Sequence, residues 1–528
     1  LLQDMPHIVL IIADDLGNEV LDPAKDSYPV TPHINQLAQQ SLRWKNFYVS
    51  PVDTLSRASI FTGRYNVRTK VLGESNGLAT MANDEMTLTE ALAGSGYKTG
   101  LFGTWGLGDH YPARATDQGF QTVLTHRGSA LNHPAQIISK GEQILLQNNY
   151  EHQIEGNVND IFFSAAKAFI KQSKNHQSSF FVTISASNPA TTPAEVVNHI
   201  ANFDKNVGEL TTLLKAEELH NNTIVILLGD TGARFSDPNS NLKGNKGSLY
   251  EGGIKSTLLI NWPNKIKQGQ IVSNSVAAHI DIMPTIMDVC GYGVEEAFGY
   301  DGRSLLPQIE NPEAQLTERA FVQQWHKGEK LTKNHHFMVR KGNWKLLNPS
   351  TPDSANLSSK NYELYDLSTD PKESTNVASQ NQTTVNELLS TYSSWFKDVT
   401  ESRLRDSAPS YILVDRMEEN PLVLTWQNRL AKNWGYQQPG FWKLSFEHAG
   451  RCDIRVEFPA NFDQDLTGWT ADLSLGKQTY SQVLHSGEQH YVFPGVQFTK
   501  GKHHLRSSFT SPDGLKTISA YQVRLLHR

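Results

Sequence analysis

The sequence predicts an α/β protein: a mixed sheet flanked by helices, then a small antiparallel sheet with a helix, then a C-terminal module resembling a β-sandwich. Three observations support this. Continuous apolar runs first alternate with helical patterns, this rhythm changes near residue 316, and strand patterns with frequent turn signals fill the end. The 528 residues also exceed the roughly 250–300 that one hydrophobic core supports. We therefore expect three units, at residues 1–315, 316–405 and 406–528.

The first unit has the pattern of a parallel sheet. Strands buried on both faces are continuous apolar runs, and His7-Ile-Val-Leu-Ile-Ile-Ala13 is such a run. The same reasoning predicts strands at 97–102, 179–185 and 222–228, and helices at 32–40, 88–93 and 160–174. Ligands of open α/β sheets lie beyond the carboxyl ends of the strands. Asp14, Asp15 and Asp230 follow such strands, so we expect them at the functional site.

The second and third units have antiparallel patterns. Residues 336–340 and 344–347 flank Lys341-Gly-Asn343, a sequence typical of a hairpin turn, and a helix is expected at 387–397. A polar joint at 400–409 precedes the last unit. The strands expected there are 442–446, 453–458, 491–493 and 521–525, with turn signals at the spacing of a sandwich.

The composition excludes several classes of protein. The formal net charge is −6, so the chain lacks the basic excess that nucleic-acid binding requires. No apolar run approaches the roughly 20 residues that span a bilayer. Cys290 and Cys452 allow no zinc motif, and Cys290 is expected in the core. The chain opens on Leu1 rather than Met, which favours a removed export signal and a periplasmic or secreted location, with a trimmed chain as the alternative. Nothing indicates the oligomeric state.

Several segments, in order over residues 6–400, resemble the formylglycine-dependent sulfatases of the alkaline-phosphatase superfamily. The signature helix is similar to Ser56-Arg-Ala-Ser-Ile-Phe-Thr-Gly-Arg-Tyr65. The other similar segments are the first strand with its acidic pair at 6–17, the following helix at 31–38, a second signature at 96–108, and later blocks at 246–255, 281–286, 301–306 and 362–367. The resemblance implies the mixed α/β fold of that family. The last unit is similar to β-rich extensions of some members.

The residue that performs the chemistry in that family is absent from its position here. The family oxidises a cysteine, four residues before the signature arginine, to formylglycine, whose hydrated aldehyde supplies the attacking oxygen. Counting back from Arg57 reaches Asp53, so no formylglycine can form and desulfation by the usual route is closed. Four further positions also lack the polar or basic residues of the family, which favours a natural departure of the site: Thr104, Gly106, Ala190 and Thr231.

The resemblance implies that Asp14, Asp15 and Asp230 bind a divalent cation, usually Ca²⁺, and carboxylate oxygens suit that ion. Asp53 could add a fourth carboxylate. The alternative is an empty metal site, in which Arg57 and Lys246 are the obvious counter-charges for acids that otherwise repel one another. Asp53 and Arg57 are spaced i and i+4, so they can pair on one helix. A purely structural helix cap is the alternative role for Asp53.

Three functions from different classes are consistent with these residues. The preferred one is cleavage of a glycosidic bond in an oligosaccharide or polysaccharide, with or without sulfate groups, because that reaction needs paired carboxylates. Asp53 and Asp230 would be the catalytic pair, and the expected substrate-binding residues are Arg57, Lys246, His110, His126 and Thr104. The alternative for the two histidines is a solvent-exposed loop position.

The second function is a non-catalytic glycan-binding relative, which drift after loss of the nucleophile would leave. The third is a hydrolase of sulfuric or phosphoric esters with an unconventional nucleophile. Thr54 is adjacent to the nucleophile position, but the register set by Ser56-Arg57 places Thr54 one residue out of line.

Overall fold

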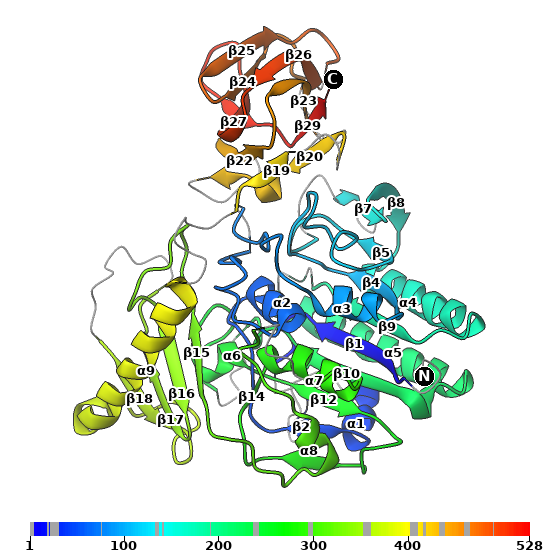
Figure 1. Cartoon of the computed structure of the whole chain (residues 1–528), viewed down its shortest axis with the longest axis vertical. Helices are drawn as coiled ribbons and strands as arrows, with labels where there is room; N and C mark the ends of the chain where they lie inside the picture. Colours follow the sequence, from blue (N-terminus) through cyan, green and yellow to red (C-terminus); the bar gives the residue numbers. More distant parts are fainter. Residues whose placement is uncertain are drawn as a thin grey trace.

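The computed structural model describes residues 5–17, 21, 31–74, 77–131, 137–139, 142–188, 190, 192–235, 242–293, 299–351, 361–401, 410–414, 419–431, 439–458, 465–488 and 490–527. Within them the predicted mixed α/β class is confirmed. A large mixed sheet lies at the centre, a small antiparallel sheet lies beside it, and a module of two sheets stands at the C-terminal end (Figure 1). None of the described helices is long and apolar enough to cross a membrane.

The central sheet has eleven strands, with β1 (His7–Ala13) in its middle. β1 runs parallel to β10 (Thr223–Gly229) on one side and to β9 (Phe180–Ser185) on the other. β4 (Lys98–Gly103) and β5 (Thr122–Thr125) continue the parallel part. The edges are β13 (Gln270–Val272), β2 (Leu42–Trp44), β12 (Leu258–Asn261), β7 (Glu142–Gln147), β6 (Ile137–Ser139) and β8 (Tyr150–Glu155). The carboxyl ends of the parallel strands therefore meet at one edge.

Helices cover both faces of this sheet because alternate residues of β1 point to opposite sides. Ile8, Leu10 and Ile12 pack in one apolar cluster, which includes α2 (Asp53–Thr62), α3 (Leu88–Gly94), α7 (Ile282–Val289) and α8 (Leu306–Glu310). Val9, Ile11 and Ala13 pack in the other, which includes α1 (Pro32–Gln39), α4 (Val158–Asn175) and α5 (Pro193–Ala216). β1 is thus enclosed on both faces, as its continuous apolar sequence predicts.

The small antiparallel sheet consists of β15 (Ala320–Gln324), β16 (Phe337–Lys341), β17 (Trp344–Leu347) and β18 (Glu363–Asp366), and it contains the predicted hairpin. α9 (Gln382–Glu401) covers one face through Leu388 and Tyr392. A buried ion network joins the sheet to the core, because Lys345 Nζ lies 3.0 Å from Glu251 Oε1 in α6 (Glu251–Ile254) and 2.8 Å from Glu373 Oε1. A three-stranded sheet combines β3 (Phe47–Tyr48), β11 (Lys255–Ser256) and β14 (Ala277–Ala278).

The C-terminal module encloses one apolar core between two sheets, with Trp442 fully buried in it. One sheet contains β19 (Ile412–Val414), β21 (Leu430–Ala431), β22 (Gly440–Phe446), β24 (Thr470–Leu475), β25 (Gln478–Val483), β27 (Gly501–Thr510) and β28 (Thr517–Ser519). The other contains β20 (Leu422–Thr425), β23 (Gly450–Glu457), β26 (His490–Phe498) and β29 (Gln522–His527). The four strands predicted in this region are present.

Several elements of the core were not predicted, among them α5 and the β7–β8 hairpin. α5 is 24 residues long and begins with a capping box at Thr192. The β7–β8 hairpin turns at Asn148 and Asn149, which both have positive φ, and most of β8 is exposed. Most of the predicted joint at 400–409, with the boundary after residue 405, lies outside the described residues. The limits of the three units stay a prediction.

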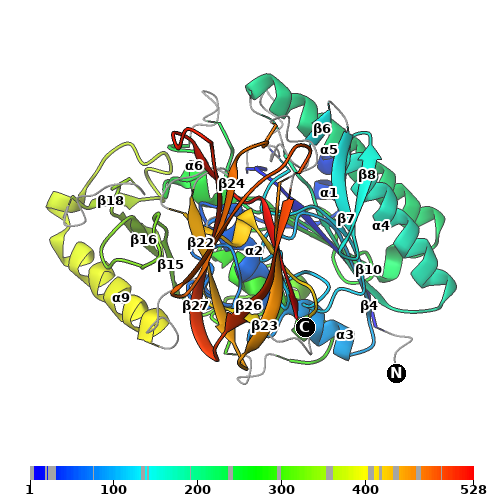
Figure 2. The same ribbon diagram turned by 90° about the horizontal axis from the view of Figure 1, so that it is seen from above.

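The C-terminal module lies over α2 when the molecule is seen from above (Figure 2). Residues 425–428, here named the docking turn, connect it to loops of the central unit. Gln427 Nε2 donates to Glu74 O at 2.6 Å, and Gly77 N donates to Gln427 O at 2.9 Å. Asn428 Nδ2 donates to Thr80 Oγ1 at 3.3 Å. Two of these hydrogen bonds hold residues 74 and 77 of one loop.

Candidate active site

The carboxyl ends of β1 and β10 bring aspartates together with the first residue of α2. Asp14 and Asp15 follow β1, and Asp230 follows β10, whose last residue pairs with Ala13. α2 begins at Asp53, and Asp53 Oδ1 accepts a hydrogen bond from Thr54 N at 2.8 Å. A carboxylate in the first helical turn is stabilised by the free N–H groups there. Asp53 is 4% exposed and Asp230 is fully buried.

Arg57 joins Asp53 to Asp230. Because Asp53 and Arg57 are one helical turn apart, their side chains lie on the same face of α2. Arg57 Nη1 lies 3.3 Å from Asp53 Oδ2, and Arg57 Nη2 donates to Asp230 Oδ2 at 2.8 Å. The predicted pairing of Asp53 with Arg57 is therefore present. A Cβ atom at Gly106 would lie 3.1 Å from Arg57 Nη1, so the glycine leaves room for the guanidinium.

Asp15 belongs to a different group of contacts. Lys246 Nζ lies 2.7 Å from Asp15 Oδ1 and 3.6 Å from Asp14 Oδ1, and Arg234 Nε lies 3.0 Å from Asp15 Oδ2. Asn188 Nδ2 and Thr231 Oγ1 also donate to Asp15, at 3.2 and 3.3 Å. Both oxygens of Asp15 are thus occupied by cations and hydrogen-bond donors.

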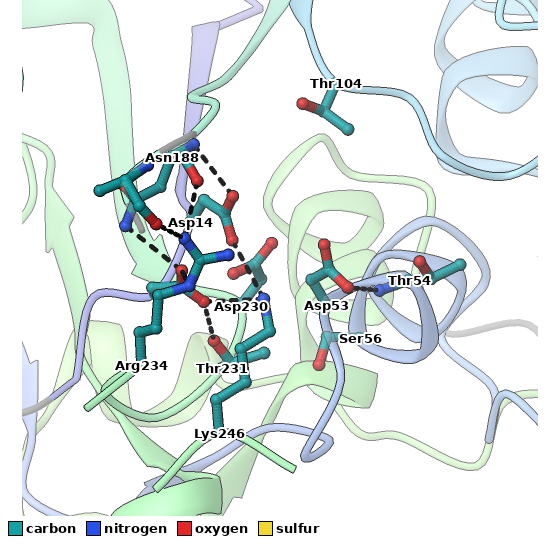
Figure 3. A network of polar contacts seen from close by, with 12 residues as sticks. Asp14, Asp53, Thr54, Ser56, Thr104, Asn188, Asp230, Thr231, Arg234 and Lys246 are labelled. Atoms are coloured by element: carbon teal, nitrogen blue, oxygen red, sulfur yellow. Dashed lines mark hydrogen bonds and ion pairs between the residues drawn. The ribbon is translucent and has the colours of Figure 1, made fainter. Parts of the chain in front are cut away.

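Asp14, Asp53 and Asp230 form the group that could hold a metal ion. Each offers one carboxylate oxygen, and the three oxygens lie within 4.8 Å of one another (Figure 3). Asp14 Oδ1 and Asp230 Oδ1 are buried and accept no hydrogen bond from the described residues. Such oxygens fit a hard divalent cation such as Ca²⁺. Asp53, expected as a fourth carboxylate, thus belongs to this set, whereas the expected ligand Asp15 lies outside it and pairs with Lys246 and Arg234.

Burial and charge shift the pKa values of this group in opposite directions. Burial raises the pKa of Asp230 well above its ordinary value, against the effect of Arg57, and Asp14 raises it further. Burial also opposes ionisation of Asp14, but Lys246 and Arg57 hold the pKa of Asp14 below its ordinary value. For Lys246, burial would lower the pKa, yet Asp53, Asp14 and Asp15 hold it well above the ordinary value. Lys246 therefore keeps its positive charge.

Thr104 and His126 form a pair beside this group. Thr104 follows β4, and its side chain lies apart from the carboxylates (Figure 3). His126 Nδ1 donates to Arg127 O at 3.0 Å, and burial lowers the pKa of His126 to about 4. The ring is therefore neutral at pH 7, and His126 Nε2 accepts from Thr104 Oγ1 at 2.9 Å. Thr54 points away from Asp230, in line with its predicted register (Figure 3).

His110 is also buried, which corrects the alternative of solvent-exposed histidines for both residues: His110 is 2% exposed and His126 is 1% exposed. The reason is the C-terminal module, whose Glu419 and Val423 line the same small cavity of about 60 Å³ as the two rings. His110 Nδ1 donates to Tyr111 O at 2.8 Å, and burial lowers the pKa of His110 to about 4. The structure records no contact between His110 and the carboxylate group among the described residues.

Glu74, Arg234 and Asn188 were not predicted at the site. Burial, and then the charge of Asp53, raise the pKa of Glu74 to about 7, so its carboxyl exchanges a proton near neutral pH. Its loop is held by Gln427 of the docking turn. No sequence signal could have found Glu74, because its position depends on a loop path and on a contact with the last unit of the chain.

The fold and this site define an α/β protein that presents carboxylates, with arginine and lysine partners, at the carboxyl edge of parallel strands. A family model described as sulfatase matches residues 6–292. A second, described as N-sulphoglucosamine sulphohydrolase, C-terminal, matches residues 244–396. The first match covers more than half of the chain, so the chain belongs to the sulfatase family.

Named relatives extend over most of the chain. An N-acetylgalactosamine-6-O-sulfatase of Bacteroides thetaiotaomicron is 24% identical over 479 residues, which cover 72% of this chain and 91% of that protein. Human arylsulfatase A is 27% identical over 433 residues, which cover 70% of this chain and 83% of that protein.

Solved structures share the fold. The structure of Ps i-CgsB in complex with k-i-k-neocarrahexaose has a TM-score of 0.66 and 23% identity, and the match covers 76% of this chain and 94% of that one. The PsFucS1 sulfatase from Pseudoalteromonas sp. has a TM-score of 0.63 and 18% identity, and the match covers 76% and 92%. At these identities the likeness shows the fold alone.

The predicted cleavage of a glycosidic bond is wrong. The relatives are named sulfatases, which act on sulfate esters, and the family model agrees with them. The prediction rested on a surplus of carboxylates at the strand ends, but Arg57, Lys246 and Arg234 pair with these acids. The prediction that the chain is a hydrolase is supported at the level of the family, whereas the non-catalytic reading has no support from the comparisons.

Proposed function

We propose that this chain hydrolyses sulfate esters of carbohydrates and that Asp53, in place of formylglycine, activates the attacking oxygen. The single observation behind this proposal is the position of Asp53. It begins α2 four residues before Arg57, contacts Arg57, and lies within the carboxylate group. The departure from the usual nucleophile is part of the proposal, as is a sulfated oligosaccharide or polysaccharide as ligand. Export from the cytoplasm stays a prediction.

The names of similar proteins support the ligand class. One relative is an N-acetylgalactosamine-6-O-sulfatase, and one solved neighbour carries a neocarrahexaose. The site supplies an anionic group with two cations, the buried Arg57 and the half-buried Lys246, which keep their charge because neighbouring carboxylates raise their pKa values. These two side chains would bind the sulfate oxygens, since charge-assisted hydrogen bonds to oxyanions are strong.

The proposed reaction is a displacement by water at sulfur. Asp53 takes one proton from a water molecule, whose oxygen forms a bond to the sulfur atom. The bond between sulfur and the sugar oxygen breaks, and its electron pair stays on the sugar oxygen. That oxygen takes a proton from Glu74, so the products are the free sugar hydroxyl and hydrogen sulfate. Solvent exchange then returns the proton from Asp53 to Glu74. General acid–base catalysis of this kind contributes roughly 10²–10⁴-fold to a rate.

A divalent cation would be held by Asp14, Asp230 and one oxygen of Asp53. When bound, it would offset the repulsion among the carboxylates and draw charge from the sulfate group. The protein side chains perform the other tasks: Arg57 and Lys246 bind the sulfate, Asp53 accepts a proton, and Glu74 donates one.

The test is Asp53→Asn with a sulfated galactan oligosaccharide, measuring inorganic sulfate by ion chromatography. We expect the wild type to release sulfate and the variant to lose at least about 100-fold in kcat, because an amide cannot accept the proton. Thr54→Val is the matched control. Thr54 is the next residue of the same helix, and its hydroxyl makes no hydrogen bond to the described residues. That variant should keep its activity. Sulfate release by Asp53→Asn at the wild-type rate would contradict the proposed role.

A further inference from the structure

A second polar groove lies away from the carboxylate group and shares no residue with it. It has a volume of about 610 Å³ and is open to solvent. Its walls are residues 273–276 and 315–319 on one side, and the β16–β17 hairpin and α9 on the other. Volumes of roughly 300–1,000 Å³ are typical of small-molecule sites. We name it the arginine groove, after its lining residues Arg303, Arg319 and Arg340.

Each of the three arginines has at least one buried donor without a hydrogen-bond partner among the described residues, although the terminal nitrogens of Arg303 donate to Thr317 O and Val276 O and those of Arg319 donate to Asp281. Arg340 is 6% exposed, and its Nε and Nη1 are buried without a hydrogen-bond partner among the described residues. The Nε atoms of Arg303 and Arg319 are also buried without a hydrogen-bond partner among the described residues. A buried donor without a partner costs roughly 1–3 kcal/mol, and more for a charged group. A ligand would have to draw these buried atoms towards the groove to accept their hydrogen bonds and remove that cost.

The electrostatics of the arginine groove favour an anion. Burial lowers the pKa of Arg340 to about 10. Burial, and then the nearby charge of Arg319, also lower the pKa of Arg303. Part of the positive charge is compensated, because Arg340 lies 4.6 Å over the ring of Tyr48 and near Glu373, and Asp281 pairs with Arg319. The exposed Lys341 adds a fourth cation, while the exposed Glu318 and Glu387 supply two acids.

The rest of the lining suits a saccharide. Trp344 is half-buried on one wall, and an aromatic ring with an apolar face can stack on a sugar ring. Amide and hydroxyl side chains complete the walls, and they pair readily with sugar hydroxyls: Asn46, Ser273, Ser275, Gln315, Asn343 and Thr391. A small inorganic anion would leave most of this volume and lining unused.

We propose that the arginine groove is a second binding site, for a sulfated saccharide chain, with the sulfate group at Arg303 and Arg340 and a sugar ring on Trp344. This site would retain a polymeric substrate while a different part of it reaches the carboxylate group. The proposal rests on the residues of the groove and holds whichever reaction Asp53 performs.

The test uses hydrogen–deuterium exchange of the full chain carrying Asp53→Asn, so that turnover cannot consume the ligand. The probes are a sulfated galactan hexasaccharide, its desulfated counterpart and sodium sulfate at equal molarity. We expect the sulfated hexasaccharide to protect residues 337–347 and the other two probes to leave them unprotected. No protection by the sulfated hexasaccharide would overturn the proposal. Equal protection by sodium sulfate or by the desulfated chain would overturn the assignment of a sulfated saccharide.

Charge variants test the groove without disturbing its buried arginines. Lys341→Glu should raise the saccharide concentration that gives half-maximal protection by about tenfold, which corresponds to roughly 1.4 kcal/mol of binding free energy. Glu387→Gln should lower that concentration. Lys477→Glu is the matched control, because Lys477 is an exposed lysine in a hairpin turn of the C-terminal module. Equal effects of Lys341→Glu and Lys477→Glu would mean that the overall charge, rather than the groove, binds the saccharide.

Discussion

Four carboxylates face three cations at the carboxyl edge of the central sheet. Arg57 binds Asp53 and Asp230, while Lys246 and Arg234 bind Asp15. Lys246 also approaches Asp14, at 3.6 Å. One negative charge is left over when all are ionised, and neighbouring carboxylates raise one another's pKa values. The raised pKa of Asp230 follows from its burial and from this crowding.

Calcium should therefore stabilise the protein. We expect Ca²⁺ added after chelation to raise the midpoint of thermal unfolding, because an ion at 100 times its dissociation constant contributes about 2.7 kcal/mol. Differential scanning fluorimetry measures this shift. Asp230→Asn should abolish it, whereas Asp472→Asn, in the C-terminal module, should retain it. Equal melting midpoints with and without divalent cations would favour the alternative of an empty metal site.

The buried His279 should make stability depend on pH. Burial, and then Arg319, lower its pKa to about 3, from 6.5. The unfolded chain binds a proton below pH 6.5 while the folded chain does not, so stability is full above pH 6.5 and falls as the pH drops towards 3. At pH 5, protonation of this one residue in the unfolded chain should lower the free energy of unfolding by about 1–2 kcal/mol. Urea unfolding of His279→Gln should show a smaller loss between pH 7.5 and pH 5 than the wild type. An identical loss of stability in the variant and the wild type would exclude His279 as a source of the pH dependence.

At the scale of elements, the parallel strands were predictable and some neighbours were not. β1, β9 and β10 are continuous apolar runs, which report burial on both faces. β8 is almost entirely exposed, so its sequence has no apolar pattern that would indicate a strand. α5 was missed although Thr192 and Pro193 mark its beginning.

Some residues of the candidate site were also predictable from the sequence, and others were not. Asp14, Asp230, Arg57 and Lys246 follow from strand ends and from the order of motifs. Glu74 was not predictable, since its surroundings depend on loops. The choice of Asp53 over Asp15 for the metal group depends on which side chains Lys246 and Arg234 reach, and spacing along the chain does not determine this.

Gly229 holds the end of β10 close to its neighbours. A Cβ atom there would lie 2.0 Å from Leu16 O and 2.4 Å from Ser256 Oγ. Gly229→Ala should therefore destabilise the fold by about 1–3 kcal/mol and, by moving the adjacent Asp230, lower the rate of sulfate release. Chemical denaturation and the sulfate assay measure the two effects. Gly94→Ala is the control, because no atom beyond its chain neighbours and the backbone of its own helix lies within 4 Å of that Cβ position. A stable, active Gly229→Ala would show that the strand end can shift.

At the scale of the molecule, the C-terminal module lies over α2 and touches the loops around the site (Figure 2). It also encloses His110 and Glu419 around one cavity. The sequence predicted the module but not its place, because surface complementarity between distant segments leaves no periodic signal. The module therefore shapes the surroundings of Glu74.

Gln427→Ala tests this contribution. Losing the hydrogen bond from Gln427 Nε2 to Glu74 O should free the loop and lower kcat several-fold, about tenfold at most, in the same direction as Glu74→Gln. The melting midpoint should change by less than about 4 °C. Gln482→Ala is the control, because the amide of Gln482 donates only to its neighbour, Val483 O, among the described contacts. Unchanged kcat in Gln427→Ala would mean that the loop holds its position without the module.

The docking turn also limits how such modules can be recombined. A chimaera that receives a foreign sandwich domain after α9 would present different side chains to Glu74, Gly77 and Thr80. Its catalytic efficiency would then depend on matching four residues of one turn rather than on the fold of the graft. An exchange of C-terminal modules between homologues should therefore preserve activity only when the docking turn is transferred together with the loop that it contacts.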